Sequence, residues 1–248
     1  VEWSSKTNSG IRSELGFIPK DEVWDKVCRE SDLCLGNKCG HKNSCFYKNA
    51  KKHERNSHML ITNHALFFTN LASGGLVLPE FHAVVFDEGQ TLEDVATSYL
   101  GHEISNTKIK YLFDSIYNPK TEKGILLKFK NQKDKVNAIK KYLEESRIGS
   151  IQFFDEISKK FGTKNEVKRL RTKNIIFNFL EEPLSSLADS IKKLLEDVKS
   201  EEEEALVKAY VKKCISLKAS LSFILTLIDD NYVYWVEVFE KRGGVKYS

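Results

Sequence analysis

Residues Phe81 to Ala96 read FHAVVFDEGQTLEDVA, and this stretch decides how the chain is interpreted. The apolar run 83–86 predicts a buried strand that ends at two adjacent carboxylates, Asp87 and Glu88. Thr91 follows as the expected cap of a helix with an acidic first turn. Ligands of open α/β sheets bind at the carboxyl ends of the strands, so the two acids occupy the position of a candidate site.

Two interpretations of these acids follow from the residues alone. In the first, Asp87 holds Mg²⁺, directly or through water, and Glu88 orients or deprotonates the water that attacks a nucleotide phosphate. In the second, both acids only favour the N-terminus of the next helix, with a contribution of about 0.3–1 kcal/mol each. An apolar run followed by Asp-Glu does not choose between these interpretations.

The bulk composition is that of an ordinary folded protein. A chain of 248 residues can bury a core as one large domain or two modest ones. Its formal net charge of +4 is too small to argue for nucleic acid by itself. No apolar run approaches the roughly 20 residues needed to cross a bilayer. We therefore expect a cytoplasmic protein that does not contact membranes.

Four of the five cysteines lie in one short segment, CRESDLCLGNKCGHKNSC. Cys28, Cys34, Cys39 and Cys45 have the spacing C-x5-C-x4-C-x5-C, which fits paired zinc knuckles poorly. The spacing leaves an iron–sulfur cluster, zinc and no metal open. Cys214 lies alone on the apolar side of a helical pattern, and we expect it to pack in the core as a small hydrophobic residue.

The segment before the acids predicts a strand and a helix, HMLITN and then HALFFTNLA, with Thr62 or Asn63 as the helix cap. From Ser105 to Asp230 helical periodicity dominates. The run 184–228 is too long for one ordinary helix, so we expect two helices or one long arm that exposes KSEEEE. Alternation around Gly243-Gly244 predicts a terminal hairpin. A helical insertion within an α/β domain explains this order.

A basic helix directly follows the cysteine segment. Its cations can track phosphates, and its two leading aromatic side chains can stack on bases, as in single-strand binding sites. A solvated basic face, with the two aromatic side chains packed on a cluster held by the cysteines, explains the pattern equally well. The candidate DNA-binding residues are Phe46, Tyr47, Lys48, Lys51, Lys52 and Arg55.

The segments ITNHALFFTNL and LVLPEFHAVVFDEGQTLEDVA together resemble the stretch around motif II of iron–sulfur DNA helicases of the DinG and XPD kind. The word CLGNKCGHKNSCFYKNAKK resembles the cysteine segment of the DinG branch. Two uncommon motifs in the family's order favour the catalytic interpretation of Asp87 and Glu88. The family's histidine is replaced by Gln90, which hydrogen-bonds but cannot titrate, so we expect an effect on coupling before one on Mg²⁺ binding.

The resemblance also implies a [4Fe–4S] cluster, with Cys34, Cys39 and Cys45 as the family's last three ligands. For the fourth ligand, either Cys28 substitutes or the ligand lies upstream of a fragment. The sequence contains no G-x-x-x-x-G-K-[ST] phosphate loop, which precedes the cysteine segment in the family, so ATP would bind mainly to residues elsewhere. We therefore expect the central fragment of a helicase, inactive alone.

The fold class implied is α/β, a partial RecA-like (P-loop NTPase) motor domain with an iron–sulfur segment and a large all-helical arch insertion. The expected segments are 1–57 (iron–sulfur segment), 58–104 (part of the first motor domain with motif II), 105–230 (arch insertion) and 231–248 (return strands to the motor domain).

The function implied is that of an ATP-dependent 5′–3′ DNA helicase that uses ATP and Mg²⁺ to translocate on single-stranded or forked DNA as a monomer, in DNA repair or replication. The alternative is a non-catalytic, metal-stabilised module for DNA binding or protein interaction. A third interpretation is a degenerate relative in which Gln90 marks lost coupling.

Overall fold

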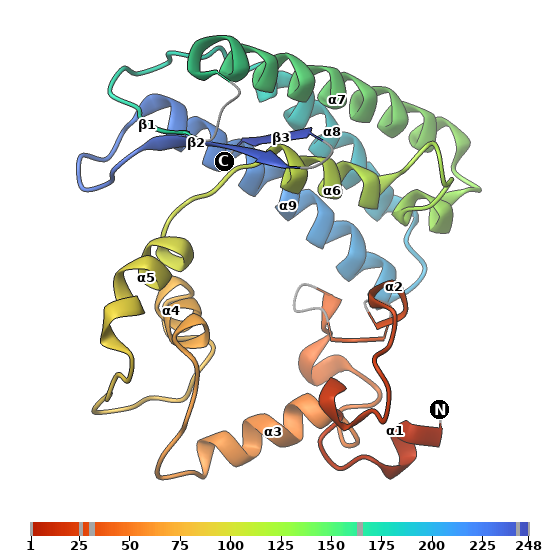
Figure 1. The fold of residues 1–248 in the computed structure, drawn as a ribbon. Coiled ribbons are helices and arrows are strands. Elements are labelled where there is room, and N and C mark those ends of the chain that lie inside the picture. Colours follow the sequence, from red (N-terminus) through yellow and green to blue (C-terminus); the bar gives the residue numbers. More distant parts are fainter. Residues whose placement is uncertain (1, 25–26, 30–32, 163–165, 242–243, 248) are drawn as a thin grey trace. The chain divides into compact units, whose positions relative to one another are not determined.

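The chain forms two compact units, residues 1–101 (unit 1) and 102–248 (unit 2), and each is described by itself (Figure 1). The computed structural model describes residues 2–24, 27–29, 33–162, 166–241 and 244–247. Within these ranges no helix combines the length and apolar character needed to span a membrane.

Unit 1 consists of short helices joined by irregular segments. Its elements in chain order are α1 (Glu2–Lys6), η1 (Arg12–Glu14), α2 (Asp21–Trp24), η3 (Gly36–Lys38), α3 (Phe46–Arg55), α4 (His64–Ala72), η4 (Gly89–Thr91) and α5 (Leu92–Leu100).

Helix α4 is fixed at both ends by asparagine side chains. Asn63 caps its N-terminus, because the side-chain Oδ1 accepts a hydrogen bond of 2.8 Å from the N–H of Leu66, and the predicted cap is confirmed. Near the C-terminus, the buried Asn70 accepts hydrogen bonds through Oδ1 from the N–H groups of Val77 and Leu78, at 2.9 and 2.8 Å. The loop that leads toward the paired acids is therefore tied to α4.

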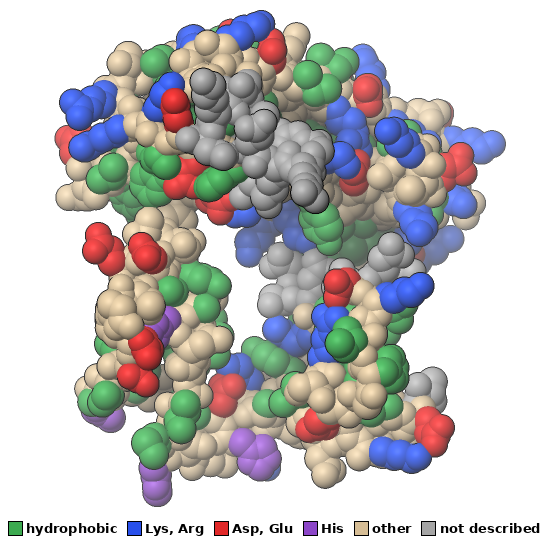
Figure 2. Space-filling model, in the orientation of Figure 1, with side chains coloured by type: hydrophobic (Ala, Val, Ile, Leu, Met, Phe, Trp, Pro, Cys, Tyr) green, Lys and Arg blue, Asp and Glu red, His purple; other side chains and the backbone are tan. Residues whose placement is uncertain are grey.

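The two strands expected in unit 1, at HMLITN and at 83–86, are not formed. Both segments are irregular, and Ile61 and Val85 are 94% and 95% exposed. Hydrophobic side chains accordingly appear on the surface of the part of unit 1 that holds α4 and α5 (Figure 2). A strand needs a neighbour that pairs its N–H and C=O groups, and the described part of unit 1 contains no such neighbour. The prediction of a sheet edge beneath the two acids is therefore wrong for this structure.

Unit 2 contains the long helices and the sheet. Its elements are α6 (Asn106–Ile116), η5 (Ile125–Phe129), α7 (Lys133–Phe161), β1 (Glu166–Arg169), α8 (Glu181–Lys192), η6 (Lys193–Asp197), α9 (Glu201–Thr226), β2 (Trp235–Lys241) and β3 (Gly244–Tyr247).

Helices α7, α8 and α9 enclose the core of unit 2. Ile139, Leu187 and Val207, one from each helix, are completely buried. Gly149 permits a close approach, because a Cβ atom there would lie 2.5 Å from the carbonyl oxygen of Phe179. The long run 184–228 divides into α8 and α9, so the first of the two expected alternatives, two helices, is the one observed.

Helix α9 begins within the acidic segment KSEEEE. Ser200 caps it, since its Oγ accepts a hydrogen bond of 3.1 Å from the N–H of Glu203. Cys214 on α9 is completely buried, as predicted, and burial raises the pKa of its thiol to about 12.

A three-stranded antiparallel sheet has the order β1-β2-β3. Glu166 pairs with Val238 between β1 and β2, and Val238 pairs with Tyr247 between β2 and β3. The predicted terminal hairpin is confirmed as β2–β3, although Gly243 lies outside the described residues. Strand β1 interrupts the stretch expected to be wholly helical, and the hairpin pairs with it. The assignment of residues 231–248 to the motor domain stays a prediction.

Candidate functional site

The paired acids lie in a tight turn, residues 87–91, which we call the acidic loop. Glu88 has φ +50° and ψ +46°, the left-handed conformation that costs a residue with a side chain roughly 1–2 kcal/mol. Its N–H donates a hydrogen bond of 2.9 Å to Oδ1 of Asp87. Its carbonyl oxygen accepts from the N–H and the hydroxyl of Thr91, at 2.9 and 3.0 Å. Local hydrogen bonds therefore hold Glu88 in this conformation.

Gln90 makes a direct side-chain contact with Glu88, one of the predicted catalytic residues. Its Nε2 donates a hydrogen bond to Oε2 of Glu88, so the Gln90 amide helps to orient this carboxylate. Thr91 occupies the cap position of α5, as predicted, but its hydroxyl bonds to the acidic loop instead of the helix. His64, at the start of α4, contacts the same hydroxyl: the distance from Nδ1 to Oγ1 is 3.2 Å.

The carboxylates of Asp87 and Glu88 are both exposed. No cluster of three or more His, Cys, Asp or Glu side chains suited to a metal is found among the described residues. Mg²⁺ is commonly held through one or two carboxylates together with water and substrate phosphates. The exposed Asp87 fits that limited role, but the acidic loop alone does not form a complete nucleotide site.

The cysteine segment does not have the geometry of a cluster site in this structure. Cys28 and Cys34 are exposed, whereas Cys39 and Cys45 are half-buried. The same search of the described residues finds no three thiols gathered around one position, and a [4Fe–4S] cluster needs four ligands. A hydrogen bond from the backbone of Gly36, and then a hydrogen bond from the side chain of Arg29 together with its charge, lower the pKa of Cys34 despite its partial desolvation.

Helix α3 uses part of the predicted DNA-binding set for its own packing. Lys51 Nζ lies 2.6 Å from Oε2 of Glu54 and 2.6 Å from the carbonyl oxygen of Val77, so this cation is tied to the fold. The guanidinium of Arg29 lies 3.7 Å from the ring centre of Tyr47. One cation of α3, Lys51, and one of its aromatic rings, Tyr47, therefore have partners within unit 1.

The remaining members of that set differ in their exposure. Lys48 donates a hydrogen bond of 2.8 Å to Asn37, and Phe46 is half-buried beside Gly10. Lys52 and Arg55 are exposed, and they are the cations of α3 best placed to contact a phosphate.

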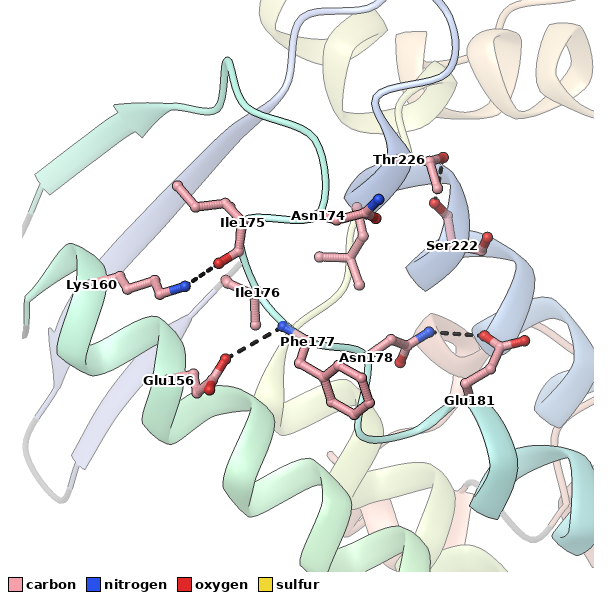
Figure 3. Close-up of a pocket in the computed structure, with 11 residues that line it drawn as sticks. Glu156, Lys160, Asn174, Ile175, Ile176, Phe177, Asn178, Glu181, Ser222 and Thr226 are labelled. Atoms are coloured by element: carbon pink, nitrogen blue, oxygen red, sulfur yellow. Dashed lines mark hydrogen bonds between the residues drawn. The ribbon is translucent and has the colours of Figure 1, made fainter.

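A half-open pocket of about 550 Å³ lies in unit 2 (Figure 3). Its floor is apolar and its edge carries Glu156, Lys160 and Glu181, with Phe177 exposed at the mouth. Lys160 donates a hydrogen bond to the carbonyl oxygen of Ile175. Sequence reasoning missed this pocket, because its lining comes from four separate segments and no local motif marks them. It contains none of the predicted site residues.

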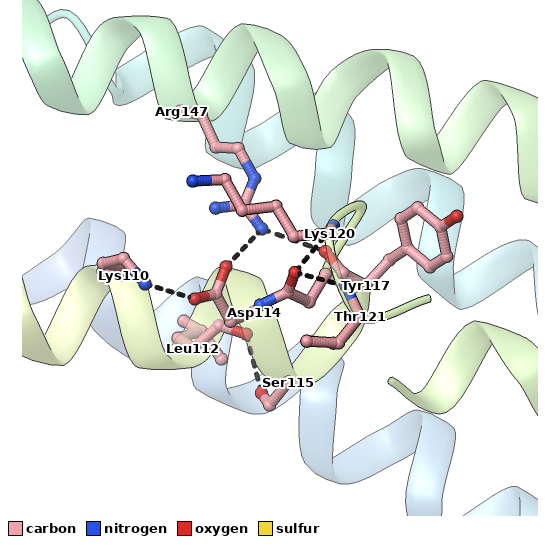
Figure 4. Close-up of polar contacts among 9 residues, drawn as sticks. Lys110, Leu112, Asp114, Ser115, Tyr117, Lys120, Thr121 and Arg147 are labelled. Carbon is pink, nitrogen blue, oxygen red and sulfur yellow. Dashed lines mark hydrogen bonds and ion pairs between the residues drawn. The ribbon is translucent and has the colours of Figure 1, made fainter. Parts of the chain in front are cut away.

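A half-buried ion pair joins α6 to α7 (Figure 4). Arg147 Nη2 lies 2.8 Å from Oδ1 of Asp114 and donates a hydrogen bond of 2.9 Å to the carbonyl oxygen of Tyr117. Lys110 approaches the other oxygen of Asp114 at 2.6 Å. Desolvation opposes ionisation of Asp114, but the hydrogen bonds from Lys110 and Arg147 outweigh it and lower its pKa. This cluster supports the fold of unit 2.

Comparison with known proteins identifies helicase relatives. No protein-family model matches the chain. The chain is 31% identical over 112 residues to the ATP-dependent DNA helicase YoaA of Escherichia coli K12, a match that covers 43% of the chain and 18% of that protein. It is 32% identical over 108 residues to the ATP-dependent helicase DinG of Mycobacterium tuberculosis H37Rv, covering 43% of the chain and 16% of the relative.

A third relative matches over more of the chain. The 3′-5′ exonuclease DinG of Bacillus subtilis 168 is 26% identical over 179 residues, which cover 68% of the chain and 19% of that protein. The chain thus spans about a fifth or less of the length of these relatives. The first two relatives are named as helicases, and the described residues of this chain are mostly helical with one small sheet. Over about half of its length the chain is similar to ATP-dependent DNA helicases of the DinG and YoaA type, and the predicted resemblance is confirmed.

Proposed function

We propose that the complete protein to which this chain belongs is an ATP-dependent DNA helicase that translocates 5′ to 3′ on single-stranded or forked DNA as a cytoplasmic monomer. The observation that carries this proposal is the similarity to relatives named ATP-dependent helicases. The acidic loop contributes two exposed carboxylates on a constrained backbone, although the sheet edge expected beneath them is not formed. The alternative, a non-catalytic binding module, is not favoured by those relatives.

In this proposal the acidic loop completes a nucleotide site with residues from the rest of the protein. Asp87 holds the Mg²⁺ that accompanies the ATP phosphates, directly or through water. Glu88 orients or deprotonates the attacking water, and its hydrogen bond from Gln90 supports that orientation. Gln90 keeps a hydrogen-bonding role at the family's histidine position without a titratable group.

The substitution Glu88→Gln in the complete protein tests the proposal. We expect the ATP turnover stimulated by single-stranded DNA to fall about 10²- to 10⁴-fold, because a general base is lost while the shape of the side chain is kept. Glu93→Gln is the matched control, since Glu93 is an exposed acid at the start of α5 and its substitution removes the same charge. Full turnover in the Glu88 variant would remove the catalytic role.

The DNA path in this proposal runs along α3. Lys48, Lys52 and Arg55 share one face of this helix by their i, i+4, i+7 spacing and can follow a phosphate backbone. Tyr47 and Phe46 can offer stacking surfaces beside them, with Lys51 as a further cation when its internal contacts open.

We also propose the [4Fe–4S] cluster, with Cys34, Cys39 and Cys45 as ligands and Cys28 or a residue elsewhere in the protein as the fourth. The support is the resemblance of this segment to the family. The thiols would have to move together on loading, because the arrangement described above does not fit the cluster. Iron and sulfide analysis of the anaerobically purified protein tests this part, and zinc or no metal would refute it.

The expected segments remain part of the proposal: an iron–sulfur segment over 1–57, motor-domain sequence over 58–104, an arch insertion over 105–230 and return strands over 231–248. The observed boundary between units, at residues 101 and 102, lies near the second of these limits.

A further inference from the structure

We propose that His64 is a positioning residue for Glu88, which acts through the hydroxyl of Thr91. This inference rests on the proposed function in one respect, that Glu88 serves ATP hydrolysis. Nothing in the sequence pattern linked His64 to the acids, because 23 positions separate it from Asp87 along the chain. The link appears only in the fold, where the first turn of α4 lies against the acidic loop.

The chain of contacts has three members. His64 Nδ1 lies 3.2 Å from Oγ1 of Thr91, and that hydroxyl donates a hydrogen bond of 3.0 Å to the carbonyl oxygen of Glu88. A hydroxyl has one proton, so the Thr91 hydroxyl cannot donate to both groups. His64 must therefore carry its proton on Nδ1 and donate it to Thr91. This tautomer is assigned from the hydrogen-bond pattern.

The His64 ring is itself held in place by its surroundings. Its centre lies 5.8 Å from that of Phe86 in an edge-to-face contact, and Phe86 makes a second edge-to-face contact with Phe67 at 5.0 Å. Asn63, the preceding residue, caps α4 and fixes the backbone from which His64 projects. The imidazole is therefore half-buried and has little freedom to leave Thr91.

The backbone of Glu88, which Thr91 anchors, is the strained part of the acidic loop. Glu88 adopts the left-handed conformation, which persists only where neighbouring contacts hold it. Its carbonyl oxygen accepts both hydrogen bonds from Thr91, so loss of the hydroxyl contact frees the backbone to relax toward ordinary φ values. Relaxation would turn the Glu88 carboxylate away from its present direction, where Gln90 also holds it.

Four variants of the complete protein test the inference: His64→Ala, His64→Asn, His64→Gln and Thr91→Val. Asparagine places a polar atom near the Nδ1 position, whereas the glutamine amide reaches the Nε2 position instead. We expect His64→Ala and Thr91→Val to lower kcat about 10- to 100-fold with KM for ATP unchanged within twofold, as for other supporting residues. His64→Asn should recover most of kcat and His64→Gln should not.

His82→Ala is the control, because His82 is an exposed histidine five positions before Asp87. Equal losses in the asparagine and glutamine variants would overturn the inference, because the Nδ1 contact would then be irrelevant. A loss expressed in KM would also overturn it, since misdirection of Glu88 affects the chemical step and not nucleotide binding.

A second measurement separates this inference from the proposed function. Amide hydrogen exchange on residues 1–248 reports the hydrogen bond from the Thr91 N–H to Glu88 without any need for ATP. Exchange of that amide should accelerate at least about tenfold in His64→Ala, remain slow in His64→Asn and stay unchanged in His82→Ala. Unchanged exchange in His64→Ala would refute the positioning role. An inactive wild-type protein with accelerated exchange in this variant would refute only the catalytic role of Glu88.

Discussion

Units 1 and 2 have similar proportions of apolar sequence but bury them very differently. Unit 2 holds a continuous core in which residues such as Phe113, Leu180 and Leu221 are at most 1% exposed. In the described part of unit 1, Phe68 is the only buried hydrophobic side chain, and it is still 8% exposed. Unit 1 instead exposes Ile61 and Val85 almost completely. A helical bundle can bury its own apolar faces, whereas a strand needs a neighbour.

The difference indicates where each unit obtains its stability. Burial of apolar surface contributes roughly 25 cal/mol per Å², so unit 2 gains most of its folding free energy from contacts among its own helices. Unit 1 depends on caps, hydrogen bonds and short aromatic contacts, such as those of Asn70 and Phe67. The candidate catalytic loop lies in the unit with the weaker internal support. Its geometry is therefore the more sensitive to single substitutions.

The largest expected difference between the units is in thiol reactivity. Cys34 in unit 1 is exposed with a lowered pKa, while Cys214 in unit 2 is buried with its pKa raised to about 12. We expect iodoacetamide at pH 7 to alkylate Cys34 at least about 10³-fold faster than Cys214 in the metal-free chain, because the thiolate is the nucleophile. Mass spectrometry of labelled peptides measures this ratio.

Denaturant provides the control for that experiment, since both thiols should react at similar rates once the chain is unfolded. Rapid labelling of Cys214 in the folded chain would mean that the core of unit 2 opens readily, and the contrast between the units would fail.

The next largest expected difference between the units is in the unfolding free energy lost on truncating an isoleucine. The matched variants are Ile139→Ala in unit 2 and Ile61→Ala in unit 1. Ile139 is completely buried, so its truncation should cost about 2–5 kcal/mol through lost burial and a cavity. Ile61 is 94% exposed, so the same change should alter stability by less than about 0.5 kcal/mol. Urea titrations of residues 1–248, followed by circular dichroism, compare the two. A comparable loss in Ile61→Ala would show that unit 1 has a core of its own.

The smallest effect concerns the pH dependence of unit 2. The folded pKa of Asp114 is lowered, so its ion pair stabilises the fold above the unfolded pKa of about 3.9 and loses that contribution as the pH falls through the folded value. Asp114→Asn should lower the unfolding free energy by about 1 kcal/mol at pH 7, and the difference should shrink as the pH approaches about 3. Urea titrations across this range measure it.

Glu14 offers the comparison in unit 1. Hydrogen bonds from Ser9 and then Thr7 lower its pKa, but it is fully exposed, so Glu14→Gln should have a smaller effect than Asp114→Asn at pH 7. A larger effect for Glu14 would reverse the order of the two units.

Local features of the chain could be predicted from sequence because they depend on neighbouring residues. The cap at Asn63, the helix break between 192 and 201, the terminal hairpin and the burial of Cys214 are all confirmed. Each depends on side-chain chemistry or periodicity within one or two turns. The motif around Asp87 and the cysteine segment, taken together, also predicted the resemblance to helicases, which the relatives confirm.

Features that depend on distant residues were missed or predicted wrongly. The strands at HMLITN and 83–86 have strong apolar patterns, but β structure requires a partner that the described part of unit 1 lacks. The same dependence hid β1, which exists because β2 pairs with it from about 70 positions away. For the same reason the sequence did not reveal the hydrogen bond that occupies Lys51 of α3, because its partner Val77 lies on another segment.

The sequence alone determined which residues are candidates for the chemistry, namely two adjacent acids, a basic helix and a cysteine segment, and to which helicases the chain is similar. Tertiary structure decided their surroundings: the left-handed backbone of Glu88, its link through Thr91 to His64, and the internal partners of Lys51 and Tyr47. The physical reason is that residue identity and short-range periodicity are properties of the chain, whereas hydrogen bonds and ring contacts between remote segments exist only after folding has brought those segments together.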